Sequence, residues 1–127
     1  METDPYQRFG GINADQYRAI RLVVDTGIHR YRWTRERAID YFMENGLLSR
    51  RDATKEVERY FNNPGQATSY MIGQLKILEL RDRARAALGN RFDIRDFHAV
   101  VLENGSVPLD VLESLVNDWI AQRRTTR

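Results

Sequence analysis

The sequence predicts an all-α protein, with about six helices in a single compact, bundle-like domain over residues 1–127 and a long central helix. Apolar residues recur every three or four positions through nearly the whole chain, which is the period of an α-helix. Only three prolines interrupt the 127 residues, and no stretch alternates apolar and polar residues as a half-buried strand would. With 42% apolar residues, a chain of this length can bury its own core.

The first three predicted helices each begin at a polar capping residue, whose side chain can accept a hydrogen bond from a free N–H of the first turn. Two of these starts also show the spacing of a capping box, with Gln16 and Asp52 three residues after the cap. The predicted spans are about 14–29 after Asn13, 35–46 after Thr34, and 50–61 after Ser49.

The fourth predicted helix is the longest, from about Gln66 to Leu88, and it carries apolar residues on two sides. A helix of that kind is usually central, with neighbours packed on both sides. A fifth helix follows Asp93 and ends at Gly105. The sixth starts with Pro108 at its first position and runs through residue 120, and residues 121–127 are expected to form a frayed tail.

Composition excludes several classes of function. The chain has no cysteine, which rules out disulfides, thiol catalysis and cysteine-based metal sites, and its two histidines cannot build a His-rich metal site. Its 20 basic residues are interleaved with 18 acidic ones, so no basic surface for nucleic acid is expected. No apolar run approaches a membrane span, and the acidic start is not a signal peptide. We therefore expect a cytoplasmic protein without a nucleic-acid or membrane partner.

Three charged or titratable residues follow one another at four-residue spacing on the first predicted helix: Arg21, Asp25 and His29. Each neighbouring pair can interact on one helix face, and an aspartate that fixes the tautomer of a histidine is a common support in catalytic sites. The alternative is a solvated face stabilised by ion pairs. Asp25, Thr26 and Gly27 also spell the triplet of aspartic proteases, but that chemistry needs two loops of a β fold.

The turn at residues 62–65 places the start of the fourth helix next to a second candidate site. Free backbone N–H groups at a helix start, here near Gly65 and Gln66, favour an anion or a developing oxyanion. Tyr70, one turn further on, can donate another hydrogen bond. The alternative is an ordinary helix start followed by a core tyrosine, because Tyr70 shares an apolar stripe with Ile77.

Four longer segments occur in order: DPYQRFG, YRAIRLVVDTGIHRYRWTRERAIDYF, NNPGQATSYMIGQLKILELR and FHAVVLENGSVPLDVLESLV. Together, over about Asp4 to Ile120, they resemble the C-terminal part of a bacterial family, the domain-of-unknown-function family 885. Full-length members look like α-helical zinc metallopeptidases of the gluzincin type. Their zinc motif, an H-E-x-x-x-H-H-like sequence followed by a glutamate on a later helix, lies upstream of the matching region. This chain has no H-E-x-x-H sequence, so the resemblance implies zinc in the full-length protein and no metal site here.

The resemblance also implies roles for individual residues within a complete enzyme. His29, supported by Asp25, would face the cleft, and Tyr70 would donate a hydrogen bond to the tetrahedral intermediate. Arg21 would pair with Asp25 or with a substrate carboxylate. The turn that contains Gly65 and Gln66 would help to bind a peptide-like substrate. The chain alone would then be inert, since nothing in it activates a nucleophile.

Two other functions stay open. The chain could be a stand-alone interaction module, which self-associates or docks on a partner through the apolar face left by the missing helices. It could also be one half of a split enzyme that a separate helical chain with the zinc motif completes.

Overall fold

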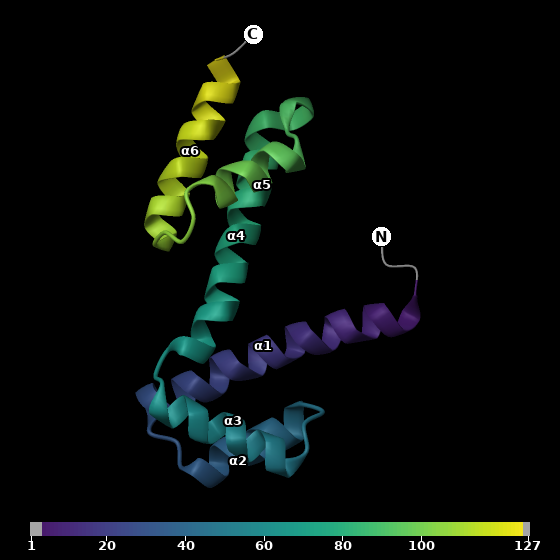
Figure 1. Cartoon of the computed structure of the whole chain (residues 1–127), viewed down its shortest axis with the longest axis vertical. Helices are drawn as coiled ribbons and strands as arrows, with labels where there is room; N and C mark the ends of the chain where they lie inside the picture. The colour runs from purple at the N-terminus through teal and green to yellow at the C-terminus, as the bar shows by residue number, and fades with distance from the viewer. Residues whose placement is uncertain (1–3, 126–127) are drawn as a thin grey trace. The chain divides into compact units, whose positions relative to one another are not determined.

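The computed structural model describes residues 4–125, which form six α-helices and one short 3₁₀ helix, with no strand among them (Figure 1). The predicted all-α fold class is therefore confirmed. The helices are α1 (Pro5–Tyr31), α2 (Arg35–Asn45), α3 (Arg50–Asn62), α4 (Gln66–Leu88), η1 (Gly89–Arg91), α5 (Ile94–Glu103) and α6 (Leu109–Thr125). No helix in this described part of the chain is long and apolar enough to cross a membrane.

The chain divides into two compact units, Met1–Ile72 and Gly73–Arg127, and helix α4 passes from the first to the second. Each unit has its own cluster of buried apolar side chains. At the level of packing the chain thus comprises two compact units that share one helix, and the single domain over residues 1–127 stays a prediction.

The first unit packs α1 against α2 and α3, which lie side by side (Figure 1). Its core contains three large buried side chains, Ile39, Phe42 and Tyr60, with Val24 of α1 among them. The first turns of α1 extend beyond α2 and α3. The core therefore holds the second half of α1 in place, and with it the polar residues described below.

Helix α1 begins earlier than the sequence predicted. Asp4 is its N-cap, with a side chain that accepts a hydrogen bond from Tyr6 N at 3.0 Å, and Pro5 stands in the first turn. The predicted start after Asn13, with its capping box to Gln16, is wrong. Proline suits the first helical position because its fixed φ is already helical and its missing N–H would have no partner there.

The other predicted helix starts agree closely with the structure. Thr34 and Ser49 accept hydrogen bonds from the backbone N–H groups of Arg37 and Asp52, each at 3.2 Å, and α4 has the predicted bounds. Pro108 stands just before the first residue of α6 rather than in its first turn. Its carbonyl accepts a hydrogen bond from Leu112 N at 3.0 Å, so its place is that of a cap.

The frayed tail expected at 121–127 is wrong for residues 121–125, which continue α6. Arg123 is paired with Asp96 of α5, and the Thr125 hydroxyl donates to backbone carbonyls one turn back, such as Gln122 O at 2.8 Å. These contacts tie the last turn to its own helix and to α5. Residues 126–127 lie outside the described part of the chain.

The second unit encloses an aromatic core. The Phe97 ring is buried, and its centroid lies 6.3 Å from the centroids of both the Phe92 and the Trp119 rings. On the surface of this unit Glu113 pairs with Lys76 at 2.7 Å and Arg83 at 2.6 Å. These two cations, through hydrogen bonds, hold the pKa of the Glu113 carboxyl below its usual value.

Helix α4 is less deeply buried than its two apolar stripes predicted. Its buried residues are Ala67 in the first unit and Leu80, Ala84 and Leu88 in the second. Leu75, in the middle of this helix, keeps 50% of its surface exposed. Phe61 near the end of α3 is likewise 42% exposed. Periodicity shows which residues share a face of a helix, but it does not show whether that face is covered.

Candidate functional site

Asp25 of α1 is buried and holds the start of α4. Its Oδ1 accepts a hydrogen bond from Gly65 N at 3.2 Å, and its Oδ2 accepts from Thr68 N at 3.0 Å and from the Thr68 hydroxyl at 2.7 Å. A carboxylate is stabilised at a helix N-terminus by these free N–H groups and by the helix dipole. The anion expected at this helix start is thus the carboxylate of Asp25 itself, and the Gly65 and Thr68 N–H groups are already used.

His29 lies one turn after Asp25 and is fixed by two acceptors. Its Nε2 is 2.8 Å from Tyr60 O and 3.4 Å from Asp25 Oδ1. A carbonyl only accepts hydrogen bonds, so Nε2 carries the hydrogen and the neutral ring keeps Nδ1 as an acceptor. The predicted proximity of Asp25 and His29 is confirmed. His29 also borders an open hollow of about 330 Å³, whose lining is Asp25, Thr26, His29, Arg30, Gly65 and Thr68.

Arg21, one turn before Asp25, is 91% buried, which is unusual for a cation (9% of its surface is exposed). The predicted Arg21–Asp25 pair is wrong, because the carboxylate of Asp25 is bonded to the start of α4. The alternative of a solvated helix face is wrong as well, because Arg21 and Asp25 are both buried. The guanidinium carbon of Arg21 instead lies 4.5 Å from the centre of the Tyr70 ring, 5.4 Å from that of Tyr17 and 5.9 Å from that of Tyr60. Arg21 Nε is buried without a hydrogen-bond partner among the described residues.

A chain of hydrogen bonds runs beside this arginine. The Tyr60 hydroxyl and Arg59 Nη2 both donate to Glu56 Oε2 at 2.7 Å. Arg59 Nη1 donates to Gln66 Oε1 at 2.6 Å, and Gln66 Nε2 donates to the Tyr70 hydroxyl at 3.3 Å. Tyr70 is half-exposed, so the interpretation of it as a core tyrosine is wrong. Its own hydroxyl hydrogen has no acceptor within the described part of the chain.

These contacts set the charge state of the site. Burial, and then the hydrogen bond to Glu56, raises the pKa of Tyr60 well above its usual value, and the same two causes raise the pKa of Tyr17. Burial acts to raise the pKa of Glu56 as well. Hydrogen bonds from Arg59, Tyr17 and Tyr60 outweigh that effect, so the Glu56 pKa is lowered. At neutral pH the tyrosines therefore stay phenols and Glu56 stays a carboxylate.

Four residues of this arrangement were missed as site residues: Tyr17, Glu56, Arg59 and Tyr60. Their spacing does carry a signal, because Tyr17 and Arg21 are four apart on α1, and Glu56, Arg59 and Tyr60 are three and four apart on α3. Such spacings are frequent on solvated helix faces, so they become informative only once the two helices are known to pack together.

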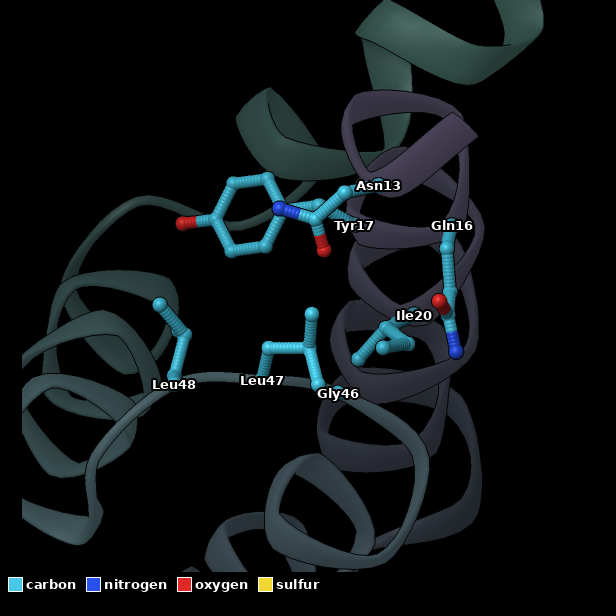
Figure 2. Close-up of a pocket in the computed structure, with 7 residues that line it drawn as sticks. All are labelled: Asn13, Gln16, Tyr17, Ile20, Gly46, Leu47 and Leu48. Carbon is cyan, nitrogen blue, oxygen red and sulfur yellow. The ribbon is translucent and has the colours of Figure 1, made fainter. Parts of the chain in front are cut away.

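A second hollow lies between α1 and the loop after α2 (Figure 2). Its volume is about 70 Å³, and the Tyr17 ring and the side chains of Leu47 and Leu48 border it. Gly46 lets the loop lie close to α1 here, since a Cβ on this residue would lie only 3.1 Å from Ile20 Cδ1. None of its lining residues carries a charge, so it suits only a small, mostly apolar group.

The described residues do not fit a zinc site. A protein zinc site uses at least three His, Cys, Asp or Glu ligands, and no group of three such side chains converges anywhere within residues 4–125. Asp25 and His29 form only a pair, and Asp25 is committed to α4. No catalytic step through a metal is therefore assigned to this chain.

Comparison with known proteins places the chain in a family. A family model described as "Bacterial protein of unknown function (DUF885)" matches residues 1–116. A structure titled "The crystal structure of the putative lipoprotein from Colwellia psychrerythraea" is 50% identical, with a TM-score of 0.93. That match covers 95% of this chain but 21% of that chain, so this chain spans about a fifth of its length. No curated protein matches. The chain therefore belongs to the DUF885 family.

Proposed function

We propose that this chain is the C-terminal helical part of a zinc metallopeptidase-like protein, in which it supplies residues that bind substrate and stabilise the transition state. The observation that carries the proposal is the buried polar cluster of the first unit, with Asp25 and Arg21 inside the protein beside the half-exposed Tyr70. Buried charges reduce stability more often than they increase it, and their presence favours a functional role. The greater length of the similar Colwellia chain supports a place within a larger protein.

Each predicted residue then has a defined task. Asp25 is a positioning residue, because it holds His29 and the start of α4. Since His29 Nε2 is committed to a carbonyl, His29 would donate to a reaction intermediate through Nδ1, in its protonated form. Tyr70 would donate through its hydroxyl. Arg21 and Gln66 would contact substrate, and Gly65 would line the hollow beside His29.

The isolated 127-residue chain is then expected to be inert. Purified chain should contain no stoichiometric zinc by elemental analysis and should not hydrolyse a mixed peptide library followed by mass spectrometry. Tightly bound zinc together with peptide hydrolysis by this chain would refute the proposal. An immunoblot of native host lysate should show a band several times heavier than 14.9 kDa.

The roles of single residues are tested in that longer natural protein. Tyr70→Phe and His29→Gln should each lower kcat/KM by about tenfold or more, since one hydrogen-bond donor to a developing charge is lost. Tyr31→Phe, at a position 69% exposed, is the matched control and should leave kcat/KM unchanged. Full activity in both site variants would exclude a catalytic role for this region. A fractionation of host cells tests the cytoplasmic location predicted from the sequence.

A second candidate is the interaction module, favoured by one surface. Tyr6, Phe9 and Ile12 near the start of α1 are 87%, 60% and 58% exposed. If this surface carries the function, Phe9→Asp should abolish self-association or partner binding in light scattering, whereas Tyr70→Phe should not affect it. A split enzyme would instead show hydrolysis only after a second chain with a zinc motif is added.

A further inference from the structure

Arg21 is a buried cation whose charge no described residue neutralises. Its guanidinium has five N–H donors, yet no hydrogen bond or ion pair to another described residue satisfies them, and Nε lies out of reach of solvent. The three tyrosine rings around it offer a partial compensation through cation–π attraction. A buried charge is ordinarily both paired and hydrogen-bonded.

Two acids are candidates to pair with Arg21, namely Asp25 one turn along α1 and Glu56, which is bonded to Tyr60, and both have other partners. Asp25 accepts three hydrogen bonds from the start of α4, and Glu56 accepts from Tyr60 and Arg59. Neither carboxylate forms a hydrogen bond or ion pair with Arg21 among the described residues. The anion that Arg21 can bind therefore comes from outside the described residues.

The surroundings favour a carboxylate over a more highly charged anion. The flat fork of a guanidinium matches the two oxygens of a carboxylate. Glu56 already places one negative charge beside the Tyr17 and Tyr60 rings, and it would repel a phosphate dianion more than a carboxylate. Tyr70 adds a donor at the open edge of the site, since its ring lies 4.5 Å from the guanidinium and its hydroxyl hydrogen is unused within the described chain.

We infer that Arg21 and Tyr70 together bind the terminal carboxylate of a peptide-like ligand, Arg21 through its guanidinium and Tyr70 through its hydroxyl. The inference rests on the proposed function, in which the same residues contact substrate. It adds that the recognised carboxylate is the terminal one and that Tyr70 shares in binding it, and it predicts a preference for ligands with a free C-terminus.

The test is a binding titration of the ¹⁵N-labelled chain, followed by NMR through the Arg21 Nε–H signal. This signal is assigned because it is missing from the spectrum of the Arg21→Lys variant. The probes are N-acetyl-dialanine, its C-terminal amide and inorganic phosphate. The acid should shift the signal saturably, and the amide and phosphate should bind at least about tenfold more weakly. Arg21→Lys and Tyr70→Phe should weaken binding of the acid, read from backbone signals of α1. Arg18→Lys changes a partly exposed arginine on the same helix, which is paired with Asp15, and should not weaken it.

Three results would overturn the inference: equal binding of acid and amide, no binding of the acid, or tighter binding of phosphate. The comparison of probes uses the unmodified chain, so it holds even where a variant fails to fold. No activity is measured, so a failure here leaves the proposed function standing. Conversely, if Tyr70→Phe and His29→Gln leave hydrolysis by the longer protein unchanged, the proposed function fails, but the inferred carboxylate binding still stands.

Discussion

Asp25 shows at the scale of single residues how one side chain joins two distant parts of the sequence. It is forty residues or more from its partners Gly65 and Thr68, yet its carboxylate takes the place of a capping residue for α4. An N-cap normally comes from the residue just before the helix, and here the position is filled from another helix. The same carboxylate lies against His29, so structural and candidate functional roles meet in one residue.

Removal of the Asp25 carboxylate should destabilise the first unit. Asp25→Ala leaves Gly65 N and Thr68 N without an acceptor, and we expect the free energy of unfolding of the first unit to fall by about 3 kcal/mol. Urea unfolding followed by Trp33 fluorescence, in a Trp119→Phe background, measures this free energy of unfolding. Asp40→Ala removes an exposed aspartate of α2 and should change stability by no more than about 0.5 kcal/mol. Equal losses in the two variants would show that Asp25 is not the cap described.

Glu56 makes the stability of the first unit depend on pH. The folded protein holds the Glu56 pKa below its ordinary value of 4.5, so near that pH the unfolded chain binds more protons than the folded one. The contribution is complete above the unfolded pKa, and it is lost as the pH falls through the lower folded pKa. Urea midpoints between about pH 6 and pH 3 should therefore fall less steeply in Glu56→Gln than in the parent chain.

The matched control for this titration is Glu58→Gln, which removes the same charge from the same helix at an exposed position paired with Arg35. A Glu58→Gln profile that resembles that of Glu56→Gln would attribute the effect to net charge. It would then not come from the hydrogen bonds of Tyr60 and Arg59 to Glu56.

At the scale of elements, the end of α1 depends on a glycine. An ideal Cβ on Gly27 would lie 2.5 Å from a ring atom of Trp33, and Trp33 N donates to Gly27 O at 2.9 Å. Arg32 between them adopts a left-handed φ of 55°, which turns the chain back toward α2. The Trp33 ring then packs beside Tyr41 of α2, with centroids 5.5 Å apart.

Gly27→Ala should therefore destabilise the first unit by about 1–3 kcal/mol, because the new methyl group displaces the Trp33 ring. Gly10→Ala is the control on the same helix. A Cβ there meets no atom within 4 Å, and alanine should stabilise the helix by about 0.5–1 kcal/mol. Thermal unfolding followed by circular dichroism gives both values. A stabilising Gly27→Ala would mean that the ring can move aside without loss.

At the scale of the whole molecule, stability is divided between two cores. Phe97, with 1% of its surface exposed, is the largest fully buried side chain of the second core, as Tyr60 and Phe42 are of the first. Each core is built from helices close together in sequence. This favours rapid folding from local contacts.

Truncation of the largest side chain in the second core should cause a large loss of stability in the second unit. Phe97→Ala removes a fully buried ring, and we expect a loss of about 3–5 kcal/mol from the second unit, observed by Trp119 fluorescence in a Trp33→Phe background. Leu102→Ala, on the same helix but 73% exposed, should change stability by about 0.5 kcal/mol or less. Comparable losses would mean that Phe97 is not central to this core.

The fold was largely predictable because its signals are local. Helical period, capping residues such as Thr34 and Ser49, and the turn at 62–65 all act within a few residues, so the starts of five of the six helices could be read closely from the sequence. The start of α1 was missed, since Asn13 and Gln16 imitate a capping box inside a continuous helix. The candidate site was predictable only in part. The Asp25–His29 contact follows from helical spacing, whereas the Arg21–Asp25 pair does not form.

The sequence by itself determined the class of fold, most helix ends and the placement of Arg21, Asp25 and His29 on one helix, because these depend on backbone propensity and on spacing along a single element. The tertiary structure alone decided which of those residues are buried and with what they pair. Asp25 turns to α4 because two free N–H groups of that helix lie within its reach, and Arg21 then remains among three tyrosines. Partners from other helices compete for each polar group, and periodicity within one helix carries no information about that competition.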